Sequence, residues 1–326
     1  MERALYGPDG FFTAPGGGPA AHFRTSVHAS AQFTGALLGL LSWLDQALGS
    51  PSRLDVVDVG AGRGELLCAL AAAAPAQLRR RLHLVAVERA PRPPGLPDWL
   101  GWRADLPGDP VTGLLVATEW LDNVPLDVAG LDEAGVARYV LVDRASGAET
   151  LGGPVSGPDA RWLARWWPLP GEPGARAEIG APRDEAWAAA VAAVRRGLAL
   201  CVDYGHMADR RPVFGTLTGF RAGRQVPPVP DGSCDITAHV AMDALVRPGA
   251  LLLAQRDALR ALGVSGQRPP LDLAHRDPAG YLRALVAASA AAELTDPAGL
   301  GGHYWLAQPV GVGPPAAWRD VARCRA

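Results

Sequence analysis

The sequence predicts an α/β fold built on a doubly wound, mostly parallel sheet. Short apolar runs recur along the chain and each stops at a polar or acidic residue, alanine-rich helical segments separate them, and a glycine cluster follows the first run. Strands that are covered by helices on both faces need continuous rather than alternating apolar sequence. Ligands of such sheets bind at the carboxyl ends of the strands. The residues that follow each run are therefore the candidate site.

The first part of the chain begins this pattern with a helix and a strand. Apolar residues between Ser30 and Leu48 repeat at the spacing of one helical face, and Gly49, Ser50 and Pro51 end that helix. Residues 54–59 are predicted as the first strand and residues 65–74 as the helix that follows it. Further strands are expected at 82–87, 111–117, 198–202 and 304–307, the last of them at a sheet edge.

Two stretches rich in glycine and proline, residues 125–185 and 205–245, interrupt this pattern. We expect them to be insertions on the substrate side of the sheet, because loops that carry function gather at that edge. The first insertion is predicted to contain a short meander, with one strand over 136–142. Helices are predicted to resume at 241–245 and 277–292.

The composition excludes several classes of enzyme. All 31 basic residues are arginine, and the chain has no lysine. Schiff-base chemistry, pyridoxal phosphate attachment and the lysine-bearing phosphate loop are excluded, because each needs an amine side chain. H-E-x-x-H and G-x-S-x-G are absent as well. The four cysteines, Cys68, Cys201, Cys234 and Cys324, are too scattered for a disulfide framework or a thiolate metal site, so no metal is expected.

Charge and hydropathy bear on partners and location. The net charge is −2, which gives no overall attraction to nucleic acid, and the arginines beside the tryptophans at 162–167 are interpreted as a solvated face. The apolar runs are far shorter than the roughly 18 residues of a membrane span. The first residues lack the apolar core of a secretory signal. We therefore expect a cytoplasmic protein that binds neither membrane nor nucleic acid; the oligomeric state is not indicated.

The glycine cluster predicts a cofactor-binding loop. Asp58, Gly60, Gly62 and Gly64 form D-x-G-x-G-x-G between a strand and a helix, where glycine permits a tight turn and a close ligand. The dinucleotide fingerprint G-x-G-x-x-G requires a third glycine at position 65, where this chain has Glu65. The Glu65 carboxylate would also repel a pyrophosphate. S-adenosylmethionine has no phosphate and carries a cationic sulfonium, so it suits this acidic bend.

Two acidic residues downstream complete the predicted cofactor site. Glu88 ends the next strand, about 24 residues after Gly64, close to the spacing of roughly 20 at which an acidic residue binds ribose hydroxyls. Asp105, after the short segment 101–103, is a candidate for binding the adenine amino group. A purely structural strand-to-helix turn is the alternative interpretation of the glycine loop.

Paired acidic residues mark a candidate acceptor site. Glu119 and Asp122 lie three residues apart just past a strand end, a spacing that places both carboxylates on one face of a helical turn. We expect them to hold either the methyl acceptor or the amino end of the cofactor. Asp203 and Tyr204 follow the next strand and are expected to border the same cleft, with Asp235 and His239 closing it. The alternatives are that Asp122 caps a helix and that His239 is a satisfied buried histidine.

Several segments besides the glycine loop form recognisable motifs. They are His22–Ser26 with Phe33 and Gly35, Glu119–Pro125, Ala177–Ile179, Asp203–Gly205, Gly215–Leu217 and Asp235–Val240. Together with Asp58–Gly64 they resemble, in order, the MidA-like S-adenosylmethionine-dependent methyltransferases, bacterial relatives of the mitochondrial assembly-factor methyltransferase that modifies an arginine on a complex I subunit. The sequence departs from the family pattern at Thr118, Asn123 and Gly223, where Asn, Ala and His are usual.

This resemblance implies a class I methyltransferase fold in which residues 1–50 form a helical segment covering the cofactor cleft and residues 51–326 form the catalytic domain. It also implies a protein substrate methylated on an arginine side chain. Glu119, Asp122, Asp203 and His239 would be catalytic, and Thr25, Ser26, Tyr204 and Asp235 would bind substrate.

Two other functions stay open at this point. One is methylation of an oxygen or nitrogen on a small molecule, and the other is a cofactor-binding assembly factor without catalysis. An N-P-P-Y signature is absent, since Thr118-Glu119-Trp120 takes its place, and this argues against adenine or glutamine amide acceptors. An open acidic groove would favour a polypeptide substrate, and a closed apolar pocket would favour a small molecule.

Overall fold

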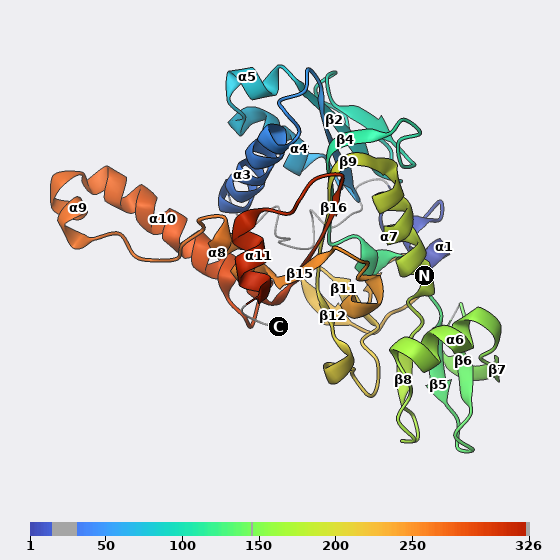
Figure 1. Cartoon of the computed structure of the whole chain (residues 1–326). Coiled ribbons are helices and arrows are strands. Elements are labelled where there is room, and N and C mark those ends of the chain that lie inside the picture. The colour runs from blue at the N-terminus through green and yellow to red at the C-terminus, as the bar shows by residue number, and fades with distance from the viewer. Residues whose placement is uncertain (15–30, 145, 324–326) are drawn as a thin grey trace.

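The computed structural model describes residues 1–14, 31–144 and 146–323, and its core is a seven-stranded sheet (Figure 1). Five neighbouring strands are parallel, which confirms the predicted mostly parallel α/β fold. In spatial order the strands are β15 (Leu251–Ala254), β16 (Tyr304–Val310), β9 (Val194–Asp203), β4 (Val111–Thr118), β1 (Leu54–Val59), β2 (Leu82–Val87) and β3 (Gly101–Arg103).

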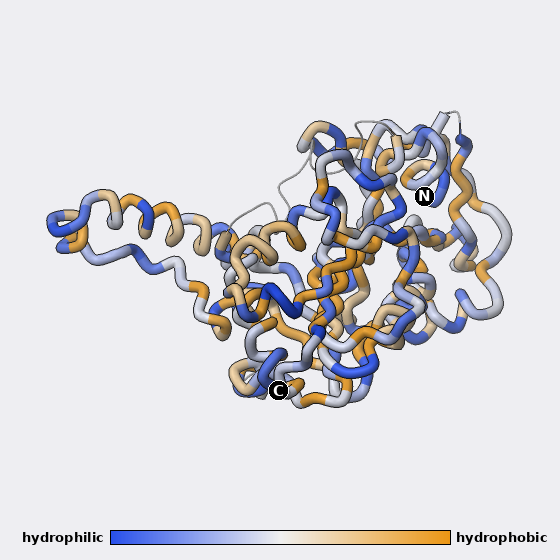
Figure 2. The backbone as a smooth tube through the Cα atoms, turned by 90° about the horizontal axis from the view of Figure 1, so that it is seen from above, coloured by the Kyte–Doolittle hydropathy of each residue, from blue (hydrophilic) through white to orange (hydrophobic). Residues whose placement is uncertain are grey.

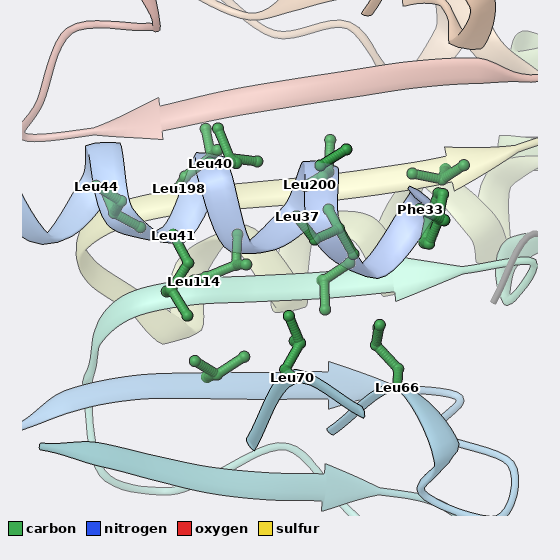
Figure 3. Close-up of a cluster of buried hydrophobic side chains, with 14 of the residues drawn as sticks. Phe33, Leu37, Leu40, Leu41, Leu44, Leu66, Leu70, Leu114, Leu198 and Leu200 are labelled. Atoms are coloured by element: carbon green, nitrogen blue, oxygen red, sulfur yellow. The ribbon is translucent and has the colours of Figure 1, made fainter. Parts of the chain in front are cut away.

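The continuous apolar runs form strands, and they are apolar throughout because helices cover both faces of the sheet. Every residue of β1 is buried, and its alternate side chains enter two separate cores. The larger core holds the leucines of α3 and α4 against β4 and β9 (Figure 3). The helices of this face are α3 (Ala31–Ala47), α4 (Glu65–Ala73), α8 (Gln255–Ala261), α10 (Pro278–Thr295) and α11 (Ala316–Arg323); α7 (Ala181–Ala193) covers the other face.

The last strand, β16, is second from the edge of the sheet and not at the edge, where the sequence analysis placed it. β16 was expected at a sheet edge, yet it pairs antiparallel with both β9 and β15, and β15 forms the edge. Leu251–Ala254 is only four residues long and was not recognised as a strand. This pairing brings the chain just before Tyr304 to the carboxyl end of β9, since Tyr304 lies opposite Asp203.

The two insertions fold as small sheets that are mostly antiparallel. The first contains the expected meander, and the predicted strand over 136–142 is present as Ala137–Val142. The second contains a three-stranded sheet and a short parallel pair. The elements are β5 (Val128–Leu131), β6 (Ala137–Val142), β7 (Glu149–Pro154), β8 (Arg176–Glu178) and α6 (Gly157–Trp166), then β10 (Gly205–His206), β11 (Thr218–Arg221), β12 (Arg224–Val226), β13 (Asp235–Thr237) and β14 (Val240–Ala241).

The remaining helices lie at the periphery. α1 (Glu2–Tyr6) packs on β13 through a small core that includes Leu5 and Ile236. α5 (Ala76–Arg79) precedes β2. α9 (Leu271–Arg276) and the start of α10 form an arm that projects from the body in both views, while apolar residues concentrate in the central strands (Figures 1 and 2). None of the described helices is long and apolar enough to cross a membrane.

The predicted helices were correct in all but one place. Residues 277–292 lie almost entirely in α10, which Asp277 caps by accepting a hydrogen bond from the Gly280 N–H. Residues 241–245 form only a single 3-10 turn, Met242–Leu245, instead of the expected helix. Pro248 and Gly249 follow closely and leave no room for a second turn.

Candidate functional site

The carboxyl ends of β1, β2, β4 and β9 meet at one edge of the sheet and open into a cavity of about 780 Å³. This volume lies in the upper part of the 300–1,000 Å³ range usual for small-ligand sites. Ten of the fourteen predicted site residues line it: Asp58, Gly60, Gly62, Glu88, Asp105, Glu119, Asp122, Tyr204, Asp235 and His239. Most of the predicted site residues therefore meet at this one cavity.

Two predicted residues in the described part of the chain, Asp203 and Gly64, do not line the cavity. Asp203 was expected to border it but lies beneath it, fully buried. Gly64 is the N-cap of α4 with a φ of 81°, and a Cβ there would lie 3.1 Å from the Leu100 side chain, so this glycine is required by the backbone turn and by close packing. Thr25 and Ser26 lie outside the described residues.

The glycine bend is shaped by two positions with different constraints. Gly60 has a φ of 73° and Gly62 a φ of 57°, in the left-handed region that disfavours side chains. A Cβ on Gly60 would lie 3.0 Å from the Trp120 ring, whereas one on Gly62 would meet only Glu65 Oε2, at 3.7 Å. Gly60 thus allows the chain after β4 to approach, and Gly62 leaves open space above the bend. No side chain fills that space among the described residues.

Glu88 is fixed against this bend. Its Oε2 accepts a hydrogen bond from the Gly62 N–H at 3.0 Å, and its Oε1 accepts one from the Ala90 N–H at 2.9 Å. Burial raises the pKa of this carboxyl, although the backbone N–H groups oppose that shift. Each oxygen keeps a lone pair for a further donor, so Glu88 can bind two hydroxyl groups next to the glycines.

Asp58, at the other side of the bend, is a buried carboxyl group in the cavity wall. Burial and the charges of Glu88 and Glu65 raise its pKa well above the usual value. Its Oδ1 has no hydrogen-bond partner among the described residues. A buried oxygen without a partner costs about 1–3 kcal/mol; a ligand that donates a hydrogen bond or carries positive charge would remove that cost.

The chain after β4 adopts an unusual conformation. Glu119 has a φ of 51°, which non-glycine residues adopt at a cost of about 1–3 kcal/mol, mostly at functional sites. Its N–H donates to the Val202 carbonyl at 2.8 Å. The next backbone N–H groups, of Trp120, Leu121 and Asp122, all donate to Asp203 Oδ2 at 3.0–3.3 Å. Asp203 therefore holds the turn that carries Glu119 and Asp122.

Asp122 is at the centre of the wall. It sits in the 3-10 turn Leu121–Asn123 and does not cap a helix. Its Oδ2 accepts hydrogen bonds from the hydroxyls of Tyr204 and Thr237, the latter at 2.6 Å. The Oδ1 atom is buried and has no partner among the described residues. Burial raises the pKa of this carboxyl.

A second buried carboxyl lies beside it. Asp235 Oδ1 accepts a hydrogen bond from Asn123 Nδ2 at 2.7 Å. Burial and the neighbouring Asp122 raise the pKa of Asp235 to about 8, so Asp235 is mostly protonated at neutral pH. Asn123, one of the departures from the family pattern, thus has a defined partner.

Two buried residues that the sequence analysis did not assign to the site hold these segments together. Arg183 on α7 donates to the backbone carbonyls of Asp122, Ala238 and His239. Glu178 accepts from the N–H groups of Thr216 and Leu217 at 2.7 and 3.0 Å. Their spacing along the chain gives no signal; Glu178 was quoted only as part of a motif.

Rings cover one side of the cavity. The Tyr204 ring lies 5.2 Å from that of His239 and 5.5 Å from that of His303. His239 is exposed at the cavity and is not the buried histidine considered as the alternative. Its backbone N–H donates to Thr216 Oγ1 at 2.9 Å. Tyr6 and Phe12, whose rings stack at 5.4 Å, line the cavity from the amino-terminal segment.

The cavity is strongly acidic. Seven carboxyl groups line it, from Asp58, Glu65, Glu88, Asp105, Glu119, Asp122 and Asp235, and Arg89 is the one arginine among the described lining residues. Asp235 is mostly protonated at neutral pH; the carboxylates that stay ionised attract cationic ligands and repel phosphates. Among the described residues no group of three or more His, Cys, Asp or Glu side chains is arranged to hold a metal ion.

Comparisons with known proteins agree with this picture. Residues 40–256 match the sequence profile of a family described as "Putative S-adenosyl-L-methionine-dependent methyltransferase". A COG1565 superfamily member from Burkholderia thailandensis, bound to S-adenosyl-homocysteine, superposes with a TM-score of 0.76 and 25% identity, covering 97% of this chain and 88% of that one. A second structure of a COG1565 superfamily protein from this organism gives 0.74 and 25%, over 97% and 87%. No curated protein matches the chain.

Proposed function

The chain belongs to the family of S-adenosyl-L-methionine-dependent methyltransferases, and from this premise we propose that it methylates an arginine side chain of a protein partner. The class I methyltransferase fold and the cofactor follow from the family. The arginine and the protein partner are the proposal. Two properties of the cavity wall support them: its negative charge and the unpartnered oxygen of Asp122.

The residues at the bend fit this cofactor. The open space above Gly62, the Glu88 carboxylate bonded to that glycine, and the unpartnered Asp58 Oδ1 suit a ribose and a cationic group. We assign ribose binding to Glu88 and adenine binding to Asp105. Bound there, S-adenosylmethionine supplies an electrophilic methyl group on a sulfonium. The carboxylates around the bend oppose a phosphate-bearing cofactor.

The observation that carries the acceptor assignment is the buried, unpartnered Oδ1 of Asp122. Tyr204 and Thr237 satisfy the other oxygen and fix the orientation of the carboxylate. An acceptor-only oxygen left free in a buried wall calls for a donor, and a charge-assisted N–H bond is the strongest available. A guanidinium supplies such donors in a planar array.

Asp122 also has the properties of a proton acceptor. A guanidinium has a pKa above 12, so its methylated nitrogen must release a proton. The pKa of Asp122 is raised by burial, which makes this carboxylate a better base than an exposed one. Glu119, on the same turn, adds negative charge beside the acceptor. Asp203 and Arg183 act as positioning residues, because they bond the backbone of this turn and of residues 238–239.

Transfer of label tests this proposal. The purified chain is incubated with methyl-labelled S-adenosylmethionine and host lysate, and label is located in protein and metabolite fractions. We expect label in protein, recovered as methylarginine after acid hydrolysis. Label in metabolites would replace the proposal with a small-molecule methyltransferase. Absence of label from both fractions, with cofactor binding intact by calorimetry, would favour an assembly factor without catalysis.

A further inference from the structure

His303 reaches the cavity from a part of the chain that contains no recognisable motif. It follows the 3-10 turn Leu300–Gly302 and immediately precedes β16. Its N–H donates to the Leu300 carbonyl at 3.1 Å, and its carbonyl accepts from the Gln255 N–H at 2.7 Å. Because β16 pairs with β9, this backbone is fixed beside Asp203 and Tyr204. Leu300 and His303 both line the cavity.

The side chain of His303 has a polar atom without a partner. Its Nδ1 is buried and forms no hydrogen bond with any described residue. Leaving such an atom unsatisfied costs about 1–3 kcal/mol, a cost that proteins accept mainly at functional sites. Tyr204 connects this atom to the acceptor site, since its ring packs against His303 and its hydroxyl donates to Asp122.

The imidazole is uncharged near neutral pH. Burial, together with the nearby His239, lowers the pKa of His303 to about 4. A neutral imidazole has one nitrogen with a hydrogen and one bare nitrogen that accepts. His303 and Asp122 therefore place two hydrogen-bond acceptors around Tyr204, one neutral and one a carboxylate oxygen.

We propose that His303 is a specificity-determining residue of the acceptor site, and that its imidazole accepts an N–H from the same guanidinium group that Asp122 binds. This inference rests on the proposed function and adds a second contact to it. A guanidinium carries five N–H groups on three nitrogens in fixed directions, so it can serve acceptors on two separate residues. An ammonium directs all its donors from one nitrogen.

The test is the binding of a short capped peptide with a single arginine to the full chain. Binding is measured by calorimetry, both without cofactor and with S-adenosylhomocysteine, for the wild type and three variants. His303→Leu removes both ring nitrogens, whereas His303→Asn keeps a polar group on this residue. His275→Leu, at an exposed histidine of α9 far from the cavity, is the matched control.

We expect His303→Leu to weaken arginine-peptide binding about tenfold, which corresponds to the loss of one hydrogen bond. His303→Asn should recover most of that loss, and His275→Leu should match the wild type. S-adenosylhomocysteine affinity should be unchanged in all three variants. Equal peptide binding by the wild type and His303→Leu would overturn the role of His303 alone. Failure of the wild type to bind the arginine peptide would overturn the proposed function, and the role of His303 with it.

Discussion

Replacing Asp122 with asparagine perturbs the proposed acceptor site at one atom. The amide keeps the shape of the carboxyl, and its oxygen can still accept hydrogen bonds from Tyr204 and Thr237 in place of Oδ2. The amide nitrogen then takes the place of Oδ1. An N–H donor would face the N–H donors of a guanidinium, and the negative charge would be lost.

The expected loss follows from these two changes. A hydrogen bond to a charged group contributes about 1.5–3 kcal/mol, and losing it lowers binding about 10–150-fold. Removing the proton acceptor lowers the rate of methyl transfer by a further factor of about 10²–10⁴. We therefore expect kcat/KM to fall at least about 1,000-fold. Folding should change by at most about 1 kcal/mol, because the packed shape and two hydrogen bonds persist.

Methyl transfer to arginine peptide is measured with labelled S-adenosylmethionine, and cofactor affinity is measured by calorimetry. Asp109→Asn, at an exposed aspartate before β4, serves as the control and should behave as the wild type. S-adenosylhomocysteine affinity should stay within about twofold. An Asp122→Asn enzyme that retains more than half of the wild-type kcat/KM would refute the reasoning.

Three further predictions follow from the same cavity. Gly62→Val should abolish S-adenosylhomocysteine binding in calorimetry. The control Gly135→Val, at a φ of 75° in open space, should bear the same backbone strain and bind the cofactor normally. Equal binding by the two variants would contradict cofactor binding at the Gly62 bend. Glu88→Gln should weaken cofactor binding about 10–100-fold, and an unchanged Kd would remove Glu88 from the ribose site. Asp235 has a folded-state pKa of about 8, above its usual 3.8. Between these two pH values the folded chain holds a proton that the unfolded chain releases. The contribution of Asp235 to the free energy of unfolding is therefore lost as the pH rises from about 4 to about 8. Between pH 6 and pH 9 the Tm of the wild type should therefore fall by at least about 2 °C more than that of Asp235→Asn; parallel curves would contradict this.

The parallel core of the fold could be predicted because its strands carry their own signal. A strand buried on both faces is apolar throughout, as in Leu54–Val59, and the predicted bounds matched the structure there and at Leu82–Val87. β15 was not predicted, since four apolar residues running into a helix look the same as the start of that helix. This strand forms only because it pairs with β16, which is a contact between segments that lie far apart in the sequence.

The cofactor side of the site could be predicted for a similar reason. Glycines after a first strand and an acid after the second are local signals, and the sheet brings their ends together. Glu88 accepts a hydrogen bond from the Gly62 N–H, so this acid lies at the glycine bend, and its contact with a ribose stays a prediction. Asp203 shows the limit of this reasoning, because an acid at a strand end can point into the cavity or bind backbone N–H groups beneath it. Sequence alone does not distinguish the two.

The residues that the sequence missed come from segments joined only by folding. Thr237 was quoted within a motif, but its hydrogen bond to Asp122 spans 115 positions in the sequence. Arg183 lies in the alanine-rich helix α7, to which the sequence analysis assigned no function. His303 precedes a strand with no motif around it. Only their burial and hydrogen-bonding environment reveals a connection to the site.

A crystal structure of the chain with S-adenosylhomocysteine tests the central claim most directly. We predict ligand density over the bend from Val59 to Glu65, with both ribose hydroxyls within hydrogen-bonding distance of Glu88 and the sulfur end on the side of Asp122. Density for the nucleoside at any other surface, or a ribose bound in the cavity away from Glu88, would contradict the assignment of this edge of the sheet.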